Sequence, residues 1–276
     1  MPDTLRSFCN DMALILQGHS DTPVLDARLL CSHVLGLDHS HFILQSNEEL
    51  LESQKANIRA LVARRLEGYC VASIIHEKDF YGRTFYVNEN VLIPRPDTET
   101  LIEAALEVLA KGSRILDVCT GSGCIGLTLA LETEASSLTL SDISPEALEV
   151  AQTNAHTYYK SANLVLSDLF QAIEGKFDII AANPPYVTLD QYEALAPEVK
   201  REPSLALIGN QGLLDRLVKE ACPHLQDKGW LFMELDPDQC KPTLMTMKSM
   251  GMVNLRSYRD LGGNLRVAAA QRQYHK

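Results

Sequence analysis

The stretch that decides the fold is Arg114-Ile115-Leu116-Asp117-Val118-Cys119-Thr120-Gly121-Ser122-Gly123-Cys124-Ile125-Gly126. Its first six residues are mostly apolar and predict a buried β-strand. The glycines that follow predict a tight turn, because glycine adopts backbone conformations that other residues avoid. The turn opens a predicted helix that runs to Glu132. A strand, a glycine-rich turn and a helix in this order are typical of an α/β unit with a ligand at the turn.

The same alternation of strand and helix continues toward the C-terminus. Pro145 predicts the start of a helix that ends at about His156, since proline is favoured in a first helical turn. Further helices are predicted over residues 213–225 and 239–250, and further strands over residues 138–142, 164–166, 176–180 and 228–234. Strands that alternate with helices pair in parallel, so we expect an α/β fold with a doubly wound, Rossmann-like sheet.

The C-terminal segment breaks this alternation. Residues 252–258 and 265–270 are both strand-like, and Gly262-Gly263-Asn264 between them predicts a turn. Two strands joined by such a turn form an antiparallel hairpin, which we expect to close the sheet.

The ligand of the glycine-rich turn follows from its charges. Asp142 ends the next predicted strand, nineteen residues after Gly123, as an acid that binds ribose hydroxyls does. The spacing Thr-Gly-Ser-Gly differs from that of a dinucleotide fingerprint, and Asp117 would repel a diphosphate but attract an ammonium group. A ligand with a ribose, an adenine and a cationic amino-acid tail fits, and S-adenosylmethionine has these parts. The alternative is a strand-turn-helix corner with acidic caps.

A second group of polar residues follows the predicted strand at residues 176–180. Asn183-Pro184-Pro185-Tyr186 comes after two alanines and ends the strand, because proline cannot donate to the ladder. In an open α/β sheet, ligands bind at the carboxyl ends of the strands. The Asn183 side-chain oxygen and the Pro184 carbonyl can accept both hydrogens of an amide or amino group, and the Tyr186 ring can pack on its face. The alternative is a proline-rich turn that caps a strand.

The N-terminal third has a different character. Residues 1–76 show apolar residues at three- and four-residue spacing and predict a small helical domain. Residues 80–87 and 91–93 are aromatic and β-branched and predict a hairpin with its turn at residues 88–90. We therefore divide the chain into a helical domain (1–76), a hairpin linker (77–93) and a ligand-binding domain (94–276). Arg95 between Pro94 and Pro96 suggests a rigid wall of a site.

The composition of the chain limits which partners, cellular compartment and types of site we expect. The net charge of −11 lowers the expectation of a nucleic-acid partner and favours a basic protein partner. No apolar run is long enough to span a bilayer, and the first residues show no secretory signal. The seven cysteines form no Cys-x-x-Cys pair, so neither a disulfide framework nor a metal site is predicted. We expect a cytoplasmic protein.

The residues from Asp117 to Gly123, with Asp142, resemble the cofactor signature of class I S-adenosylmethionine methyltransferases. Asn183-Pro184-Pro185-Tyr186 resembles the motif of enzymes that methylate amide or exocyclic amino nitrogens. With residues 93–99, Arg201-Glu202-Pro203 and the helical front domain, nearly the whole chain resembles the bacterial release factor glutamine methyltransferases, the PrmC/HemK family.

This resemblance implies a seven-stranded sheet with one antiparallel strand and a helical N-terminal domain that helps to dock the substrate. The implied reaction transfers a methyl group from S-adenosylmethionine to the glutamine of the Gly-Gly-Gln loop in class-one peptide chain release factors, giving N5-methylglutamine and S-adenosylhomocysteine. It needs no metal, nucleic acid or membrane, and we expect a monomer. Other functions left open are methylation of a ribosomal-protein glutamine, methylation of a nucleic-acid amino group, and a non-catalytic cofactor-binding module.

The resemblance also assigns roles to residues of this chain. Asn183 and Tyr186 would be catalytic, and they would bind the substrate together with Pro184 and Pro185. The cofactor would contact Asp117, Cys119, Thr120, Gly121, Ser122, Gly123, Asp142, Ile143, Asp168, Leu169 and Asn183. Cys119 stands where many members have glycine, Leu169 where some have tryptophan, and Asp236-Pro237 where a glycine is expected.

Overall fold

A computed structural model of the chain describes residues 4–273, so the outermost residues of the first and last predicted domains lie outside it. The chain divides into two compact units. The helical unit comprises the residues up to Glu77 together with Ala196–Arg201, and the sheet unit comprises Lys78–Leu195 and the residues from Glu202 onward. The segment Ala196–Arg201 therefore belongs with a part of the chain more than a hundred positions away.

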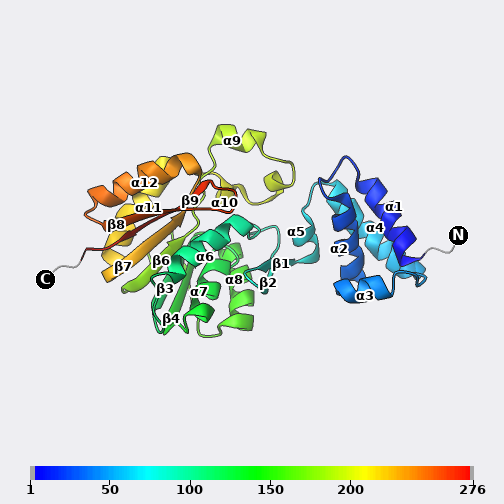
Figure 1. Ribbon diagram of the computed structural model, residues 1–276, viewed down its shortest axis with the longest axis horizontal. Coiled ribbons are helices and arrows are strands. Elements are labelled where there is room, and N and C mark those ends of the chain that lie inside the picture. The colour runs from blue at the N-terminus through cyan, green and yellow to red at the C-terminus, as the bar shows by residue number, and fades with distance from the viewer. Residues whose placement is uncertain (1–3, 274–276) are drawn as a thin grey trace. The chain divides into compact units, whose positions relative to one another are not determined.

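The helical unit consists mainly of short helices (Figure 1). They are α1 (Leu5–Leu16), α2 (Pro23–Leu35), α3 (His39–Leu44), α4 (Glu52–Leu66), α5 (Val71–Ile75) and the 3-10 helix η2 (Val199–Arg201). Leu16, Leu30 and Ile58 are fully buried and form its core with neighbouring apolar residues. Arg65, itself buried, pairs with Asp26 at 2.7 Å and with Glu198 at 2.6 Å, which holds the later segment in this unit.

The sheet unit contains a seven-stranded sheet with the order β5-β4-β3-β6-β7-β9-β8. The strands are β3 (Arg114–Val118), β4 (Ser137–Asp142), β5 (Asn163–Leu166), β6 (Phe177–Ala182), β7 (Leu225–Glu234), β8 (Val253–Arg259) and β9 (Leu265–Gln271). β3 to β7 pair in parallel, whereas β9 runs antiparallel to both β7 and β8. The predicted Rossmann-like sheet with one antiparallel strand is confirmed.

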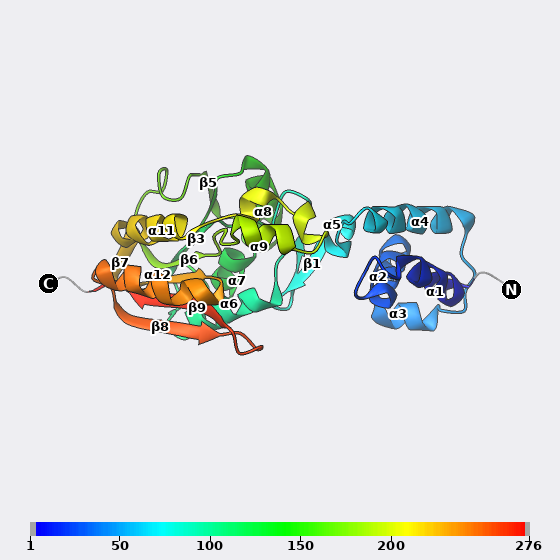
Figure 2. The same cartoon turned by 90° about the horizontal axis from the view of Figure 1, so that it is seen from above.

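Helices cover both faces of this sheet. Side chains of α6 (Glu99–Leu106), α7 (Cys124–Glu132) and α8 (Pro145–Tyr158) pack with Ile115 and Ile179 on one face. Side chains of α11 (Gln211–His224) and α12 (Pro237–Ser249) pack with Leu116 and Ile180 on the other, where these two helices lie side by side (Figure 2). The alternation of Ile115 and Leu116 between the two faces follows from the two-residue period of a strand. The short helices η1 (Pro96–Thr98), α9 (Leu189–Ala194) and α10 (Ser204–Leu207) complete the unit.

The hairpin between the two regions differs from the prediction in its register. Its strands are β1 (Glu77–Phe80) and β2 (Arg83–Tyr86), so the turn lies at Tyr81-Gly82 and not at residues 88–90. Tyr81 and Gly82 both have positive φ (48° and 71°), as a two-residue hairpin turn requires. Residues 91–93 form no strand because the Ile93 amide donates to the Glu202 carboxylate instead of to a neighbouring strand.

The chain changes direction across the sheet at β3. It adds β4 and β5 on one side of β3 and then returns to place β6 on the other side. Val118, the last residue of β3, pairs with Ser141 of β4 and with Ala182 of β6. The two predicted motifs follow directly after Val118 and Ala182, so they meet at the topological switch point where such sheets bind ligands. No helix within residues 4–273 has the length and apolar character that crossing a membrane requires.

Candidate active site

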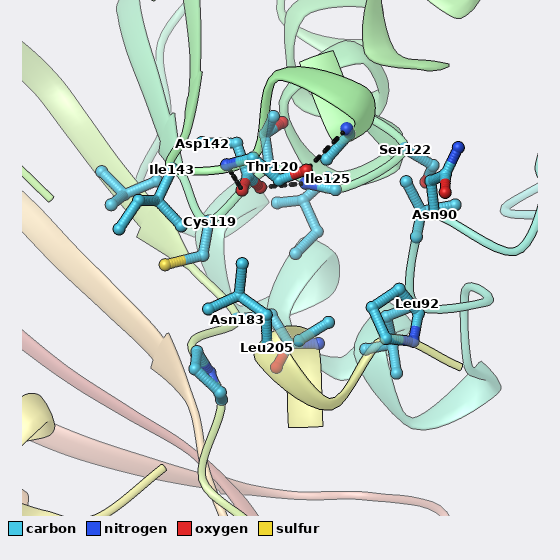
Figure 3. A pocket seen from close by; sticks show the side chains of 18 of the residues that line it. Asn90, Leu92, Cys119, Thr120, Ser122, Ile125, Asp142, Ile143, Asn183 and Leu205 are labelled. Atoms are coloured by element: carbon cyan, nitrogen blue, oxygen red, sulfur yellow. Dashed lines mark hydrogen bonds between the residues drawn. The ribbon is translucent and has the colours of Figure 1, made fainter. Parts of the chain in front are cut away.

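A cavity opens at the carboxyl ends of β3, β4, β5 and β6. Ten of the predicted site residues line it: Cys119, Thr120, Gly121, Ser122, Asp142, Ile143, Asp168, Leu169, Asn183 and Pro185. Figure 3 shows Asp142 and Ile143 at one end, Asn183 and Leu205 at the other, and Cys119 between them. Asp117, Gly123, Pro184 and Tyr186 are not among its lining residues, and each has a different environment.

The turn after β3 is fixed by backbone hydrogen bonds to its neighbours. The Thr120 amide donates to the Ser141 carbonyl of β4 at 3.0 Å, and the Gly123 amide donates to the Thr120 carbonyl at 2.8 Å. Gly123 has a φ of 82° and directly precedes α7. Gly126, in the first turn of α7, packs so closely that an added Cβ would lie 2.6 Å from Leu140 and 2.8 Å from the Asp117 Cβ. The glycines therefore let the helix start against the strands.

Asp117 supports this turn from behind. Its Oδ2 accepts from the Thr120 hydroxyl at 2.6 Å and from the Gly126 amide at 2.9 Å. Its Oδ1 is buried and has no hydrogen-bond partner among the described residues. Complete burial raises the pKa of Asp117 to about 7, and the two hydrogen bonds act in the opposite direction. Asp117 thus braces the loop rather than forming the cavity surface.

Asp142 faces the cavity from the end of β4. Its Oδ2 accepts from the Gly121 amide at 2.9 Å and its Oδ1 from the Ser144 amide at 3.0 Å. These bonds tie the carboxylate to the glycine turn and to the start of α8. Burial raises the pKa of Asp142, while the backbone donors lower it. Each carboxylate oxygen keeps a lone pair that can accept from a ligand hydroxyl.

Two residues of the cavity wall have backbone conformations that favour glycine. Cys119 has a φ of 59° and Leu169 a φ of 49°, both in the left-handed region. Leu169 is buried and packs on the apolar cluster of β3 and β6, so its side chain forms a fixed apolar wall. Burial raises the pKa of the Cys119 thiol far above its usual value, so this thiol stays protonated and is no nucleophile at neutral pH.

The turn after β6 divides its side chains between the cavity and the protein interior. Asn183 and Pro185 line the cavity, and the Asn183 Oδ1 has no donor among residues 4–273. Tyr186 turns toward β7, where its hydroxyl donates to Glu234 Oε1 at 3.5 Å. The backbone of Tyr186 is held as well, because Gln239 of α12 donates to its carbonyl at 3.0 Å.

A later segment presses against this turn. The Val187 amide donates to the Leu207 carbonyl at 2.9 Å, and the Gly209 amide donates to the Val187 carbonyl at 3.0 Å. Gly209 lies so close that an added Cβ would be 1.7 Å from the Pro185 carbonyl oxygen. The position of the Asn-Pro-Pro-Tyr turn therefore depends on a glycine more than twenty residues later.

The same later segment and the region around Arg95 form the outer wall of the cavity. Glu202 is buried and accepts from the Ile93 amide at 3.1 Å and from the Arg95 guanidinium. Arg95 and Arg201-Glu202-Pro203 both belong to motifs of the sequence, but their pairing was not predicted. Most residues of this wall were not predicted either; they include Asn90, Leu92, Thr98, Leu205, Ile208 and Leu213. Most of these residues lie in turns, irregular stretches or short helices, where no periodic pattern could have identified them.

The cavity combines carboxylates with apolar walls. Asp142 and Asp168 line it, and Asp168 is held by Arg216 at 2.9 Å. No group of three or more His, Cys, Asp or Glu side chains that could hold a metal occurs in the described part of the chain. The arrangement suits an elongated ligand with hydroxyls, a flat apolar group and positive charge.

Comparison with known proteins identifies similar chains. Residues 96–199 match the family model "Methyltransferase small domain", and residues 10–75 match "PrmC N-terminal domain". The chain is 38% identical to the release factor glutamine methyltransferase of Koribacter versatilis over 275 residues, which cover 97% of this chain and 98% of the relative. It is 37% identical to the protein of the same name from Leptospira interrogans, over 90% of this chain and 91% of the relative.

Among solved structures, the 16S rRNA N2 G1207 methyltransferase of T. thermophilus, in complex with AdoMet and guanosine, has the same fold. It aligns with a TM-score of 0.54 at 20% identity and covers 71% of this chain and 50% of that one. The likeness at this identity concerns the methyltransferase fold alone.

Proposed function

The chain belongs to the release factor glutamine methyltransferase family, and we propose that it methylates the side-chain amide nitrogen of a release-factor glutamine. The substrate would be the Gly-Gly-Gln loop of a class-one peptide chain release factor and the methyl donor S-adenosylmethionine. The observation that carries the proposal is the register of β3 and β6, which pairs Val118 with Ala182. Cys119 and Asn183 therefore begin two adjacent turns at one cavity, one suited to the donor and one to the amide.

The residues of the cavity fit this donor. Asp142 would accept hydrogen bonds from the ribose hydroxyls. Each of its carboxylate oxygens accepts from one backbone amide and keeps a lone pair for a ligand. Ile143 and Leu169 would enclose the adenine, with Asp168 at its edge. The backbone from Cys119 to Gly123 would surround the methionine part, and the buried Asp117 and the half-buried Asp142 would favour its positive charge. When bound, S-adenosylmethionine supplies a methyl group already activated by a sulfonium.

The chain's own task is to orient the amide and exclude water. Asn183 Oδ1 is buried and has no donor among the residues that the structure describes, so it would accept one amide hydrogen, and the Pro184 carbonyl would accept the other. Accepting both hydrogens concentrates electron density on the nitrogen. The nitrogen–carbon bond forms as the sulfur–carbon bond breaks, and the nitrogen then loses one proton to solvent. The proposal involves a cytoplasmic protein substrate, a monomeric enzyme and no metal.

The test is to incubate the protein with methyl-labelled S-adenosylmethionine and a full-length class-one release factor, and to locate the label by peptide mass spectrometry. A ribosomal-protein substrate and unmethylated DNA run in parallel. We expect label on the Gly-Gly-Gln glutamine. Label on another substrate alone would contradict the proposed substrate and leave the proposed donor intact.

Asn183→Ala tests the proposed site. Its turnover should fall at least about a hundredfold, as for the loss of a positioned polar group at a reaction centre. Asn163→Ala is the matched control, because Asn163 is exposed at the start of β5. A near-normal turnover number in Asn183→Ala would exclude Asn183 from the proposed role.

A further inference from the structure

Glu234 is a buried carboxylate for which the proposed transfer has no use. It is 1% exposed and ends β7. The pairing of Met233 with Ala182 of β6 places Glu234 one position further along, beside the start of the Asn-Pro-Pro-Tyr turn. A carboxylate at this depth is costly unless it is paired or functional.

The contacts of Glu234 lead to Tyr186. Its Oε1 accepts from the Tyr186 hydroxyl at 3.5 Å, and its side chain is also hydrogen-bonded to Thr98. Its Oε2 is buried with no donor within residues 4–273. Gln239 holds the Tyr186 carbonyl at 3.0 Å. Tyr186 is therefore fixed at its backbone by α12 and at its hydroxyl by β7.

Several charged groups from other elements face this pair. Arg266 of β9 lies near both Glu234 and Tyr186, and it forms ion pairs with Asp97 and Asp260, each at 3.1 Å. The pKa of Glu234 is raised to about 7, mainly by burial and also by Asp97, although Thr98, Arg266 and Tyr186 act to lower it. The other facing groups are Cys124 of α7 and Asp236 after β7.

The hydroxyl of Tyr186 acts as the donor in this pair. Burial raises the pKa of Tyr186, and Glu234 raises it further, so the phenol keeps its proton. An ionised Glu234 accepts a charge-assisted hydrogen bond from it, which is stronger than a bond between neutral groups. A protonated Glu234 is a weaker acceptor, and a proton on its Oε2 would meet no partner among residues 4–273.

We propose that Glu234 is a positioning residue for methyl transfer: its carboxylate holds the Tyr186 hydroxyl and so fixes the turn that presents Asn183 to the cavity. The inference rests on the proposed function for the role of Asn183. The contact between Glu234 and Tyr186 does not depend on the proposed function.

Ionisation of Glu234 gives this role a pH dependence. Glu234 loses its proton as the pH rises through about 7, so the hold on Tyr186 strengthens over that range. Turnover at saturating donor and substrate should rise with pH and level off above that point. Asp117 ionises in the same range but braces the cofactor turn, so its effect belongs to the KM for the donor.

The experiment is a double-mutant cycle with Glu234→Gln and Tyr186→Phe, each measured as kcat against pH. Glu234→Gln should lower kcat roughly tenfold at high pH and abolish the rise near neutrality, since a hydrogen bond to a charged group is lost. In the Tyr186→Phe background, Glu234→Gln should lower kcat only slightly further. Full additivity of the two losses, or an unchanged pH profile in Glu234→Gln, would overturn the inference. Exposed Glu174→Gln is the control.

Unfolding by urea separates this inference from the proposed function. The pKa of Glu234 is higher in the folded state than the usual glutamate value of 4.5, so the contribution of this group to stability is lost as the pH rises from about 4.5 to about 7. Glu234→Gln should therefore gain stability relative to the wild type over that range. Tyr186→Phe should shift the urea midpoint of unfolding less in the Glu234→Gln background than in the wild type. If these shifts occur but no release factor is methylated, the proposed function fails alone; if they are absent, the inference fails alone.

Discussion

The turn after β3 and the turn after β6 are neighbours at the edge of one sheet, but they are stabilised in different ways. The first turn is held by nearby strand ends: Asp117 bonds to Thr120 and Gly126, and Asp142 bonds to Gly121. All of these residues lie within one strand-helix-strand unit. The second turn is held by segments far along the chain, namely Gly209, Glu234 and Gln239.

This difference explains why the turn after β3 is a recognisable local motif, whereas the turn after β6 depends on the whole sheet unit. The turn after β3 can form wherever β3, α7 and β4 assemble. The Asn-Pro-Pro-Tyr turn needs α12, β7 and the segment around Gly209 to be in place. Substitutions far away in sequence should therefore disturb turnover through the second turn and leave binding at the first turn intact.

Gly209→Ala gives the largest expected effect and tests the dependence of the second turn on a distant residue. The added Cβ would lie 1.7 Å from the Pro185 carbonyl oxygen, so the turn must move. A displacement of about 1 Å can cost roughly a hundredfold in turnover. We expect kcat to fall by about this factor while the donor Kd, measured by calorimetry, changes little.

The matched control for this change is Gly212→Ala. Its added Cβ would approach only the Asn210 side-chain oxygen, at 3.1 Å. Its kcat and melting temperature should stay near those of the wild type. A normal kcat for Gly209→Ala would contradict the proposed difference between the two turns, because the second turn would then not depend on this packing.

Asp142→Ala tests the first turn with a smaller expected effect. It removes a carboxylate that would accept from two ribose hydroxyls, and it frees the Gly121 and Ser144 amides. At about 1 kcal/mol for each hydrogen bond, donor affinity should fall about tenfold or more. Calorimetry measures the change, and Asp227→Ala, at an exposed position, serves as control. Unchanged affinity would remove Asp142 from the site.

The smallest expected effect concerns the backbone of the first turn. At an ordinary position alanine is more stable than glycine, but the φ of 59° at Cys119 should reverse this order. Cys119→Gly should be more stable than Cys119→Ala by about 1 kcal/mol, the size of the left-handed penalty. Urea unfolding of the two variants gives the difference. A more stable Cys119→Ala would show that the turn relaxes to another conformation.

The class of fold and the two motifs could be predicted from the order of the residues alone. The alternation of apolar strands with helices, read from Arg114 onward, predicts a parallel sheet because each element shows its own period over a few residues. Gly121, Asp142 and Asn183 were identified because strand ends, glycines and prolines are local signals. The family resemblance rests on the same short stretches.

The way in which these motifs are held in place could not be predicted and became visible in the folded chain. The contact of Gly209 with Pro185, the ion pair of Arg95 with Glu202 and the contact of Glu234 with Tyr186 join residues 24 to 107 positions apart. The hairpin turn at Tyr81-Gly82 was also missed, because two positive φ values there depend on the surrounding backbone and not on a typical turn sequence. Contacts of this kind depend on packing between elements, which no local pattern of residues records.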